Sequence, residues 1–86
     1  MNVHSTSLDI PAQRIGAQVR AERDRLGLRQ DELALAAGVS TRVVHQIENG
    51  KATSRLDSLV AVLGALGLTL VVARPPLADP SAGEER

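Results

Sequence analysis

The chain has 86 residues, ten Lys or Arg, ten Asp or Glu and a formal net charge of zero, and it contains no Cys, Phe, Trp or Tyr. A chain of this length forms one small domain with a modest core, and without Cys it can form neither a disulfide nor a thiolate metal site. Without aromatic rings it lacks the surfaces on which proteins stack single-stranded nucleic acid.

The first helix is expected to begin at Pro11, because the missing N–H of proline would be unpaired in a first turn anyway. It is predicted to end at Leu26 and to turn Ile15, Val19 and Leu26 inward. The polar residues 1–10 are expected to be flexible, and they lack the basic head and apolar run of a secretory signal. No segment approaches the ~18 apolar residues of a membrane span, so we expect a cytoplasmic protein without a membrane partner.

Glycines separate the helices that follow. Gly27 and Gly38 stand where left-handed residues end helices, and they bound a second helix over residues 30–37. Ser40 is a good N-cap for a third helix, which is expected to end near Asn49 and to bury Val43, Val44 and Ile47.

A fourth helix is predicted after Thr53-Ser54, with Leu56, Leu59, Val60, Leu63 and Leu66 at helical spacing. It is followed by a short apolar, β-branched run typical of a strand, formed by Leu68, Thr69, Leu70, Val71 and Val72. No other segment resembles a strand, so we predict that this run pairs with its copy in a homodimer. The expected domains are a flexible 1–10, a DNA-binding unit at 11–67, a dimerisation strand at 68–73 and a disordered tail at 74–86.

The spacing of small and apolar residues around Gly38 predicts a helix-turn-helix. Leu33 and the small Ala34 face inward from the second helix, and Val44 and Ile47 from the third. Gly38 allows the sharp turn between them. The same spacing also fits an ordinary pair of antiparallel helices that binds nothing.

The run GLRQDELALAAGVSTRVVHQIENGK, followed by evenly spaced leucines, resembles the Xre-type regulators. The resemblance implies a mainly α, four-to-five-helix lambda-repressor-like fold that binds double-stranded DNA. One departure is Arg29, where the family usually has a Thr or Ser cap, and losing this cap should cost the second helix ~1 kcal/mol.

The stretch LGLTLVVARP carries a second resemblance, to the HipB-like antitoxins. Such proteins pair a C-terminal strand across a homodimer, repress their own operon and bind a HipA-like toxin kinase. By this resemblance the chain would be a repressor and antitoxin with a palindromic operator. The alternatives are a stand-alone Xre-type regulator and a protein-interaction module that has lost DNA binding.

The exposed face of the third helix is expected to read base edges, through Thr41, Arg42, His45 and Gln46. Arg can pair with guanine and Gln with adenine, Thr can touch a thymine methyl group, and the role of His depends on its tautomer. Residues around this helix are expected to contact phosphates: Arg29, Gln30, Ser40, Asn49, Lys51 and Arg55. Glu48 is interpreted as structural, in an ion pair with Arg20 or Arg23.

Catalysis is not expected. The two His residues lie in the N-terminal segment and on the third helix, and the chain has no nucleophile elbow and no phosphate-binding glycine loop. We therefore predict a protein that is not an enzyme and that needs neither a cofactor nor a metal.

Overall fold

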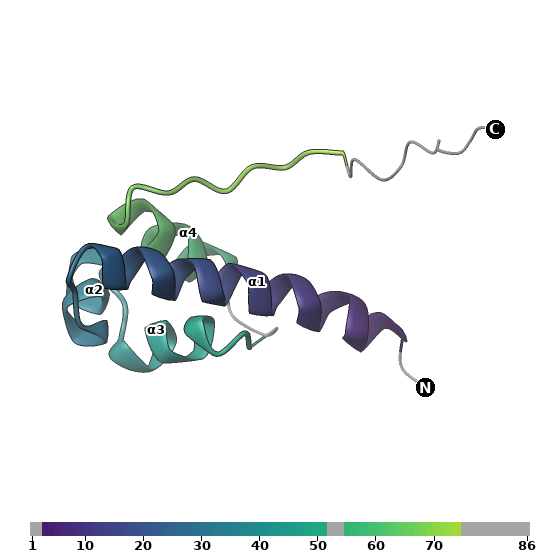
Figure 1. The fold of residues 1–86 in the computed structure, drawn as a ribbon, viewed down its shortest axis with the longest axis horizontal. Coiled ribbons are helices and arrows are strands. Elements are labelled where there is room, and N and C mark those ends of the chain that lie inside the picture. The colour runs from purple at the N-terminus through teal and green to yellow at the C-terminus, as the bar shows by residue number, and fades with distance from the viewer. Residues whose placement is uncertain (1–2, 52–54, 75–86) are drawn as a thin grey trace.

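Four helices make up the regular structure of the residues that can be described. A computed structural model describes the backbone of residues 3–51 and 55–74, and the side chains from Pro11 onward within these ranges. The helices follow the chain in order (Figure 1): α1 Val3–Arg25, α2 Gln30–Ala37, α3 Thr41–Glu48 and α4 Leu56–Ala65.

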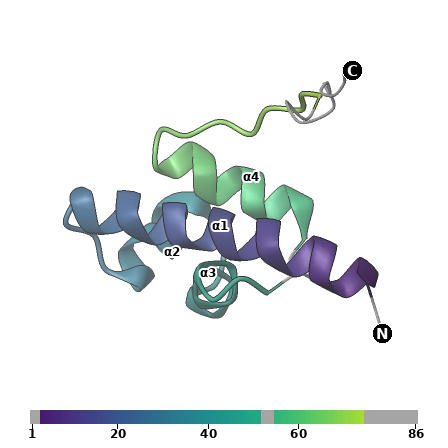
Figure 2. The same ribbon diagram turned by 45° about the vertical axis from the view of Figure 1, so that its right-hand side comes forward.

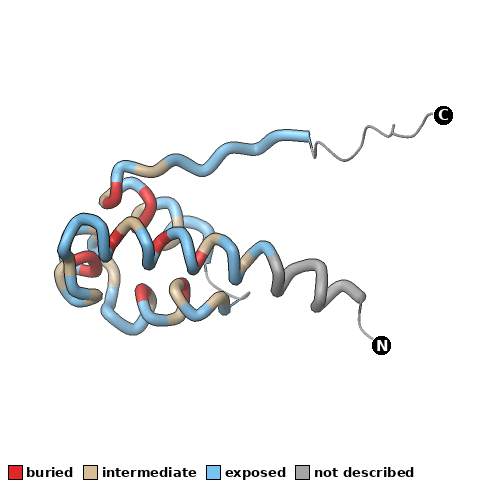
Figure 3. The backbone as a smooth tube through the Cα atoms, viewed as in Figure 1, coloured by how far each residue is buried: buried red, intermediate tan, exposed pale blue. Residues whose placement is uncertain are grey.

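The core forms where the inner faces of the four helices meet (Figure 3). Every helix contributes to it, and eight apolar residues are buried: Val19, Leu33, Ala34, Val44, Ile47, Val62, Leu63 and Leu66. This arrangement confirms the predicted inward faces of the second and third helices. The predicted face of the fourth helix is confirmed in part: Leu63 and Leu66 are buried and Leu59 packs against the core. Leu56 and Val60 are exposed, and Val62 is buried in their place. Leu26, predicted to face inward from the first helix, is exposed because the helix ends before it.

The turn between α2 and α3 is the one that the sequence predicts. Gly38 has φ +74°, and its N–H donates to the carbonyl oxygen of Leu35. Val39 then donates to the carbonyl oxygen of Ala34. A side chain is strained in this left-handed conformation, so glycine lets α3 turn back across α2.

The predicted start of the first helix is wrong. α1 begins at Val3, eight residues before Pro11, and Pro11 lies inside it. A proline suits a first turn but does not require one; inside a helix it removes one backbone hydrogen bond, and here the helix continues on both sides. The flexibility of residues 1–10 stays a prediction.

The chain leaves α4 as an extended segment, residues 68–74, which forms no strand within the described part of the chain. It lies on the side of the molecule opposite α3 (Figures 1 and 2). Leu68 packs against the core and its N–H donates to the carbonyl oxygen of Leu63. Residues 75–86 of the tail predicted at 74–86, and the predicted helix start at Thr53-Ser54, lie outside the described residues.

Candidate nucleic-acid interface

α3 presents a polar face to solvent because its apolar face is buried. Val44 and Ile47 anchor the helix in the core, and Thr41, Arg42 and His45 are exposed on the outside. Gln46, expected on the same face, is half-buried. The helix can therefore offer hydrogen-bonding side chains to a groove without disturbing the core.

The N-terminus of α3 is capped as predicted. The hydroxyl oxygen of Ser40 accepts a hydrogen bond from the backbone N–H of Val43 at 3.2 Å. This bond satisfies one of the otherwise unpaired N–H groups of the first turn. The hydroxyl proton of Ser40 is not used by the cap, so it can still be donated to a phosphate.

Two predicted DNA contacts on α3 pair with each other. The side-chain Nδ2 of Asn49 lies 2.9 Å from Nε2 of His45, one helical turn away. The backbone N–H of Asn49 also donates to the carbonyl oxygen of His45 at 3.1 Å. The amide of Asn49, which is predicted to contact phosphate, is thus directed to His45, which is predicted to contact a base.

A nearly buried ion pair ties three helices together. Glu48 has a side chain only 4% exposed, and it accepts hydrogen bonds from Arg23 Nε at 2.5 Å and from Arg23 Nη2 at 2.9 Å. Gln30 Nε2 donates to the same carboxylate at 3.1 Å, and Arg23 Nη1 donates to the carbonyl oxygen of Leu28 at 2.8 Å. The expected pairing of Glu48 with Arg23 is confirmed, and α1, the start of α2 and the end of α3 meet at one carboxylate.

These contacts keep Glu48 ionised. Burial acts to raise the pKa of Glu48, but the hydrogen bonds from Arg23 and Gln30 and the positive charges of Arg23 and Arg20 outweigh burial, so the pKa lies below its ordinary value. The pKa of Arg23 is raised, chiefly by its hydrogen bond to Glu48. Both groups are therefore charged at neutral pH.

Gln30 stands at the first position of α2, where backbone N–H groups are unpaired. One proton of its amide is engaged by Glu48. The second amide proton remains for a phosphate, since an amide nitrogen carries two donors. Glu48 thus fixes how the Gln30 side chain is turned.

The cations near α3 differ in whether acids neutralise them. Arg29 Nε contacts Asp31 at 3.1 Å, and Arg55 Nη2 contacts Asp57 at 2.7 Å, so both would have to exchange a carboxylate for a phosphate. Arg42 forms no ion pair with any residue that the structure describes. Its charge is therefore available on the outer face of α3.

The predicted contact residues lie near α3 in the structure, but sequence reasoning missed two of the hydrogen bonds that they form within the protein. All of them lie on α3, at the start of α2 or in the segments that flank α3. The pairs Gln30–Glu48 and His45–Asn49 were not predicted, although the four-residue spacing of His45 and Asn49 is a signal for a contact on one helix face. Their roles in binding DNA stay predictions.

Comparison with known proteins identifies the family. Residues 19–72 match the helix-turn-helix family model. Over 61 residues the chain is 43% identical to the uncharacterised HTH-type transcriptional regulator y4mF of Sinorhizobium fredii, covering 71% of this chain and 80% of that protein. It is 35% identical over 65 residues to the HTH-type transcriptional regulator PrtR of Pseudomonas aeruginosa, covering 76% of this chain and 25% of PrtR.

Among the described residues, no helix combines the length and the apolar character that crossing a membrane requires. The family match covers the turn between α2 and α3 and the capped α3, and the relatives are named as HTH-type transcriptional regulators. The chain belongs to the helix-turn-helix family of DNA-binding transcriptional regulators.

Proposed function

We propose that the protein is a sequence-specific repressor that lays α3 in the major groove of a palindromic operator. The observation that carries the proposal is the exposed face of α3, on which Arg42 lies together with Thr41 and His45. Arg42 forms no ion pair with an acidic residue in the described structure. An arginine of this kind can donate two hydrogen bonds to guanine O6 and N7.

Phosphate contacts are proposed on both sides of α3. The second amide proton of Gln30 and the hydroxyl proton of Ser40 are suitable neutral donors. Lys51 and Arg55 add cations beyond the end of α3. Such contacts fix the register of a protein on DNA, whereas base contacts determine the sequence that it prefers.

We also propose a homodimer joined through residues 68–72. The exposed fraction rises along the segment, from 41% at Leu70 to 73% at Val71 and 96% at Val72. Large apolar side chains that are this exposed favour a second surface that covers them. The extended backbone also offers N–H and C=O groups that an antiparallel copy can pair.

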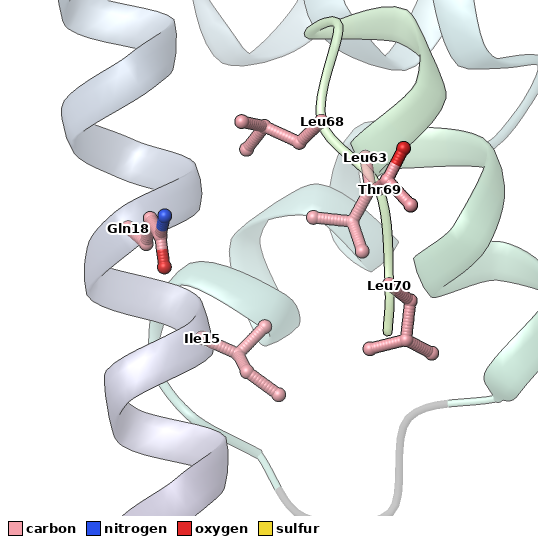
Figure 4. A pocket seen from close by; sticks show the side chains of 6 residues that line it. All are labelled: Ile15, Gln18, Leu63, Leu68, Thr69 and Leu70. Carbon is pink, nitrogen blue, oxygen red and sulfur yellow. The ribbon is translucent and has the colours of Figure 1, made fainter. Parts of the chain in front are cut away.

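A groove beside the segment supports this proposal (Figure 4). Ile15 and Gln18 of α1 face Leu63 and the start of the extended segment across it. An apolar side chain of the partner that entered this groove would contact Ile15, Leu68 and Leu70. Because the segment lies opposite α3 (Figure 1), such a dimer would leave both reading helices uncovered.

The antitoxin role rests on the HipB-like resemblance of the same segment. Here we propose that the dimer represses its own operon and binds a toxin kinase encoded beside it. Co-expression with an adjacent kinase gene, followed by purification of a stable complex, is the test. If no kinase gene lies beside the gene of this protein, and the protein still regulates transcription, it is the stand-alone regulator instead.

The test of the proposed function is binding to the DNA upstream of the chain's own gene. We expect a gel shift on this duplex that excess unrelated DNA does not remove. Arg42→Ala should weaken binding to the operator by ~1–3 kcal/mol and relax the preference at one base pair. Equal losses on operator and unrelated DNA would make Arg42 a phosphate contact, and no shift with the wild-type chain would favour an interaction module.

A further inference from the structure

The pair formed by His45 and Asn49 fixes what the histidine can offer to DNA. His45 lies on the exposed face of α3, and Asn49 caps the C-terminus of this helix one turn later, with its Nδ2 2.9 Å from Nε2 of His45. An amide nitrogen can only donate hydrogen bonds, so Nε2 must be the acceptor. In a neutral imidazole the ring proton then resides on Nδ1.

Two further contacts hold this arrangement in place. The backbone of Asn49 is held by its N–H bond to the carbonyl oxygen of His45, and the next residue, Gly50, donates to Ile47 at 3.0 Å. Glu48, the acid nearest in sequence, points inward to Arg23 and does not compete for the ring. Within the described residues the Nδ1 atom of His45 forms no hydrogen bond.

We infer that Asn49 is a positioning residue that sets the tautomer of His45, and that His45 reads an acceptor on a base edge through its Nδ1–H. In the major groove the acceptors are guanine O6 and N7, adenine N7 and thymine O4. The amino groups of cytosine N4 and adenine N6 are donors, and they would meet the ring proton unfavourably. This inference rests on the proposed DNA-binding function and deepens it.

The first test needs no DNA. Nitrogen-15 NMR of the free, full-length chain reports which ring nitrogen carries the proton. We expect a protonated Nδ1 and a bare Nε2 in the wild type, and a mixture of tautomers in Asn49→Ala. A wild-type ring protonated at Nε2 would overturn the inference while leaving DNA binding by α3 intact.

The second test uses Asn49→Asp, which reverses the polarity of the pair. A carboxylate only accepts, so it should draw the ring proton to Nε2 and leave Nδ1 as an acceptor. Both proteins are used to select duplexes from a randomised pool, in buffer alkaline enough that NMR shows a neutral ring. At one base position we expect the wild type to prefer an acceptor and Asn49→Asp to prefer an amino group, each by about three- to tenfold.

The preference is a ratio between duplexes for one protein, so a uniform loss of affinity from the added negative charge cancels. Lys51→Gln serves as the control and should weaken all duplexes alike. If Asn49→Ala behaves like Lys51→Gln and keeps the wild-type preference, Asn49 contacts phosphate and the inference is overturned. If the wild type selects no sequence at all, the proposed function is wrong, and this inference, which rests on it, is wrong as well.

Discussion

Gly16 determines how closely α1 can approach the end of α3. A Cβ atom at this position would lie 2.2 Å from the carbonyl oxygen of Ile47 and 2.9 Å from that of Glu48. Both obstacles are backbone atoms, so rotation of a side chain cannot relieve the clash. The small residue therefore allows the end of α3, with Glu48, to lie directly against α1.

Gly16→Ala and Gly64→Ala should change stability in opposite directions. Overpacking costs about 1–3 kcal/mol, and for Gly16→Ala we expect a loss that exceeds the gain of ~1 kcal/mol from better helix propensity. Nothing lies within 4 Å of a Cβ at Gly64, so Gly64→Ala should gain up to ~1 kcal/mol. Urea unfolding of both variants measures this, and a Gly16→Ala protein as stable as Gly64→Ala would contradict the close approach.

Glu48 should make stability depend on pH in the acid range. Its pKa is lowered in the folded chain, so its contribution is fully present above the ordinary value of 4.5 and is lost as the pH falls through the lower, folded pKa. Each unit of difference between the folded and unfolded pKa is worth about 1.4 kcal/mol.

The test compares the wild type with Glu48→Gln by urea unfolding from about pH 7 down to about pH 3. At neutral pH the variant should be less stable, because Arg23 keeps its burial but loses its buried countercharge and retains only the exposed Asp24 at 3.3 Å. As the pH falls, the free energy of unfolding of the variant should then decrease less than that of the wild type. NMR titration of the Glu48 carboxyl group in the wild type gives the pKa directly, and a value at or above the ordinary one would refute this account.

At the scale of the element, α2 begins without a side-chain cap. Arg29 occupies the N-cap position and forms no capping hydrogen bond through its side chain. Glu32 supplies a partial substitute, since its carboxylate accepts the backbone N–H of Arg29 at 2.8 Å. One N–H of the first turn of α2 therefore lacks the side-chain oxygen that Ser40 gives α3.

Arg29→Ser should restore that oxygen and stabilise the fold by ~1 kcal/mol, as measured by the free energy of unfolding. Arg29→Ala is the matched control, since it removes the same side chain without adding a cap. If Arg29 also contacts phosphate, both variants should bind DNA less tightly by a similar factor. Equal stability of the two variants would show that α2 does not need a cap here.

The elements were predictable where local signals coincide with helix ends. α2 was predicted with its observed bounds, and Ser40 and Asn49 flank α3 as expected. These bounds were predictable because capping residues and left-handed glycines act on the helix end next to them in the sequence. Pro11 misled because its local preference does not decide where a helix starts. The sequence left both Arg20 and Arg23 open as partners of Glu48, and it did not predict the bond from Gln30, because these contacts bridge helices far apart in sequence and depend on the packed fold.

At the scale of the whole molecule, one side carries α3 and the other carries an exposed apolar segment (Figure 2). A two-fold axis through the segment would make the contact self-complementary and would place two strands antiparallel. It would also relate two copies of α3, and about one DNA turn of ~34 Å between them would match a palindromic operator. Within the described part of the single chain the segment pairs with no strand, which agrees with the proposal that its partner belongs to another copy.

The dimer is tested by sedimentation of Val71→Pro and of a chain that ends at Leu68. Proline removes a backbone donor from the ribbon, whereas Val71→Thr keeps a β-branched residue and serves as the control. Because Leu68 is the last residue of the segment packed against the core, the shortened chain should keep its helical circular dichroism. We expect the wild type and Val71→Thr to be dimers, and the other two to be monomers that bind a full operator no better than a half-site. A shortened chain that stays dimeric would place the dimer contact elsewhere and remove the main support for the HipB-like role.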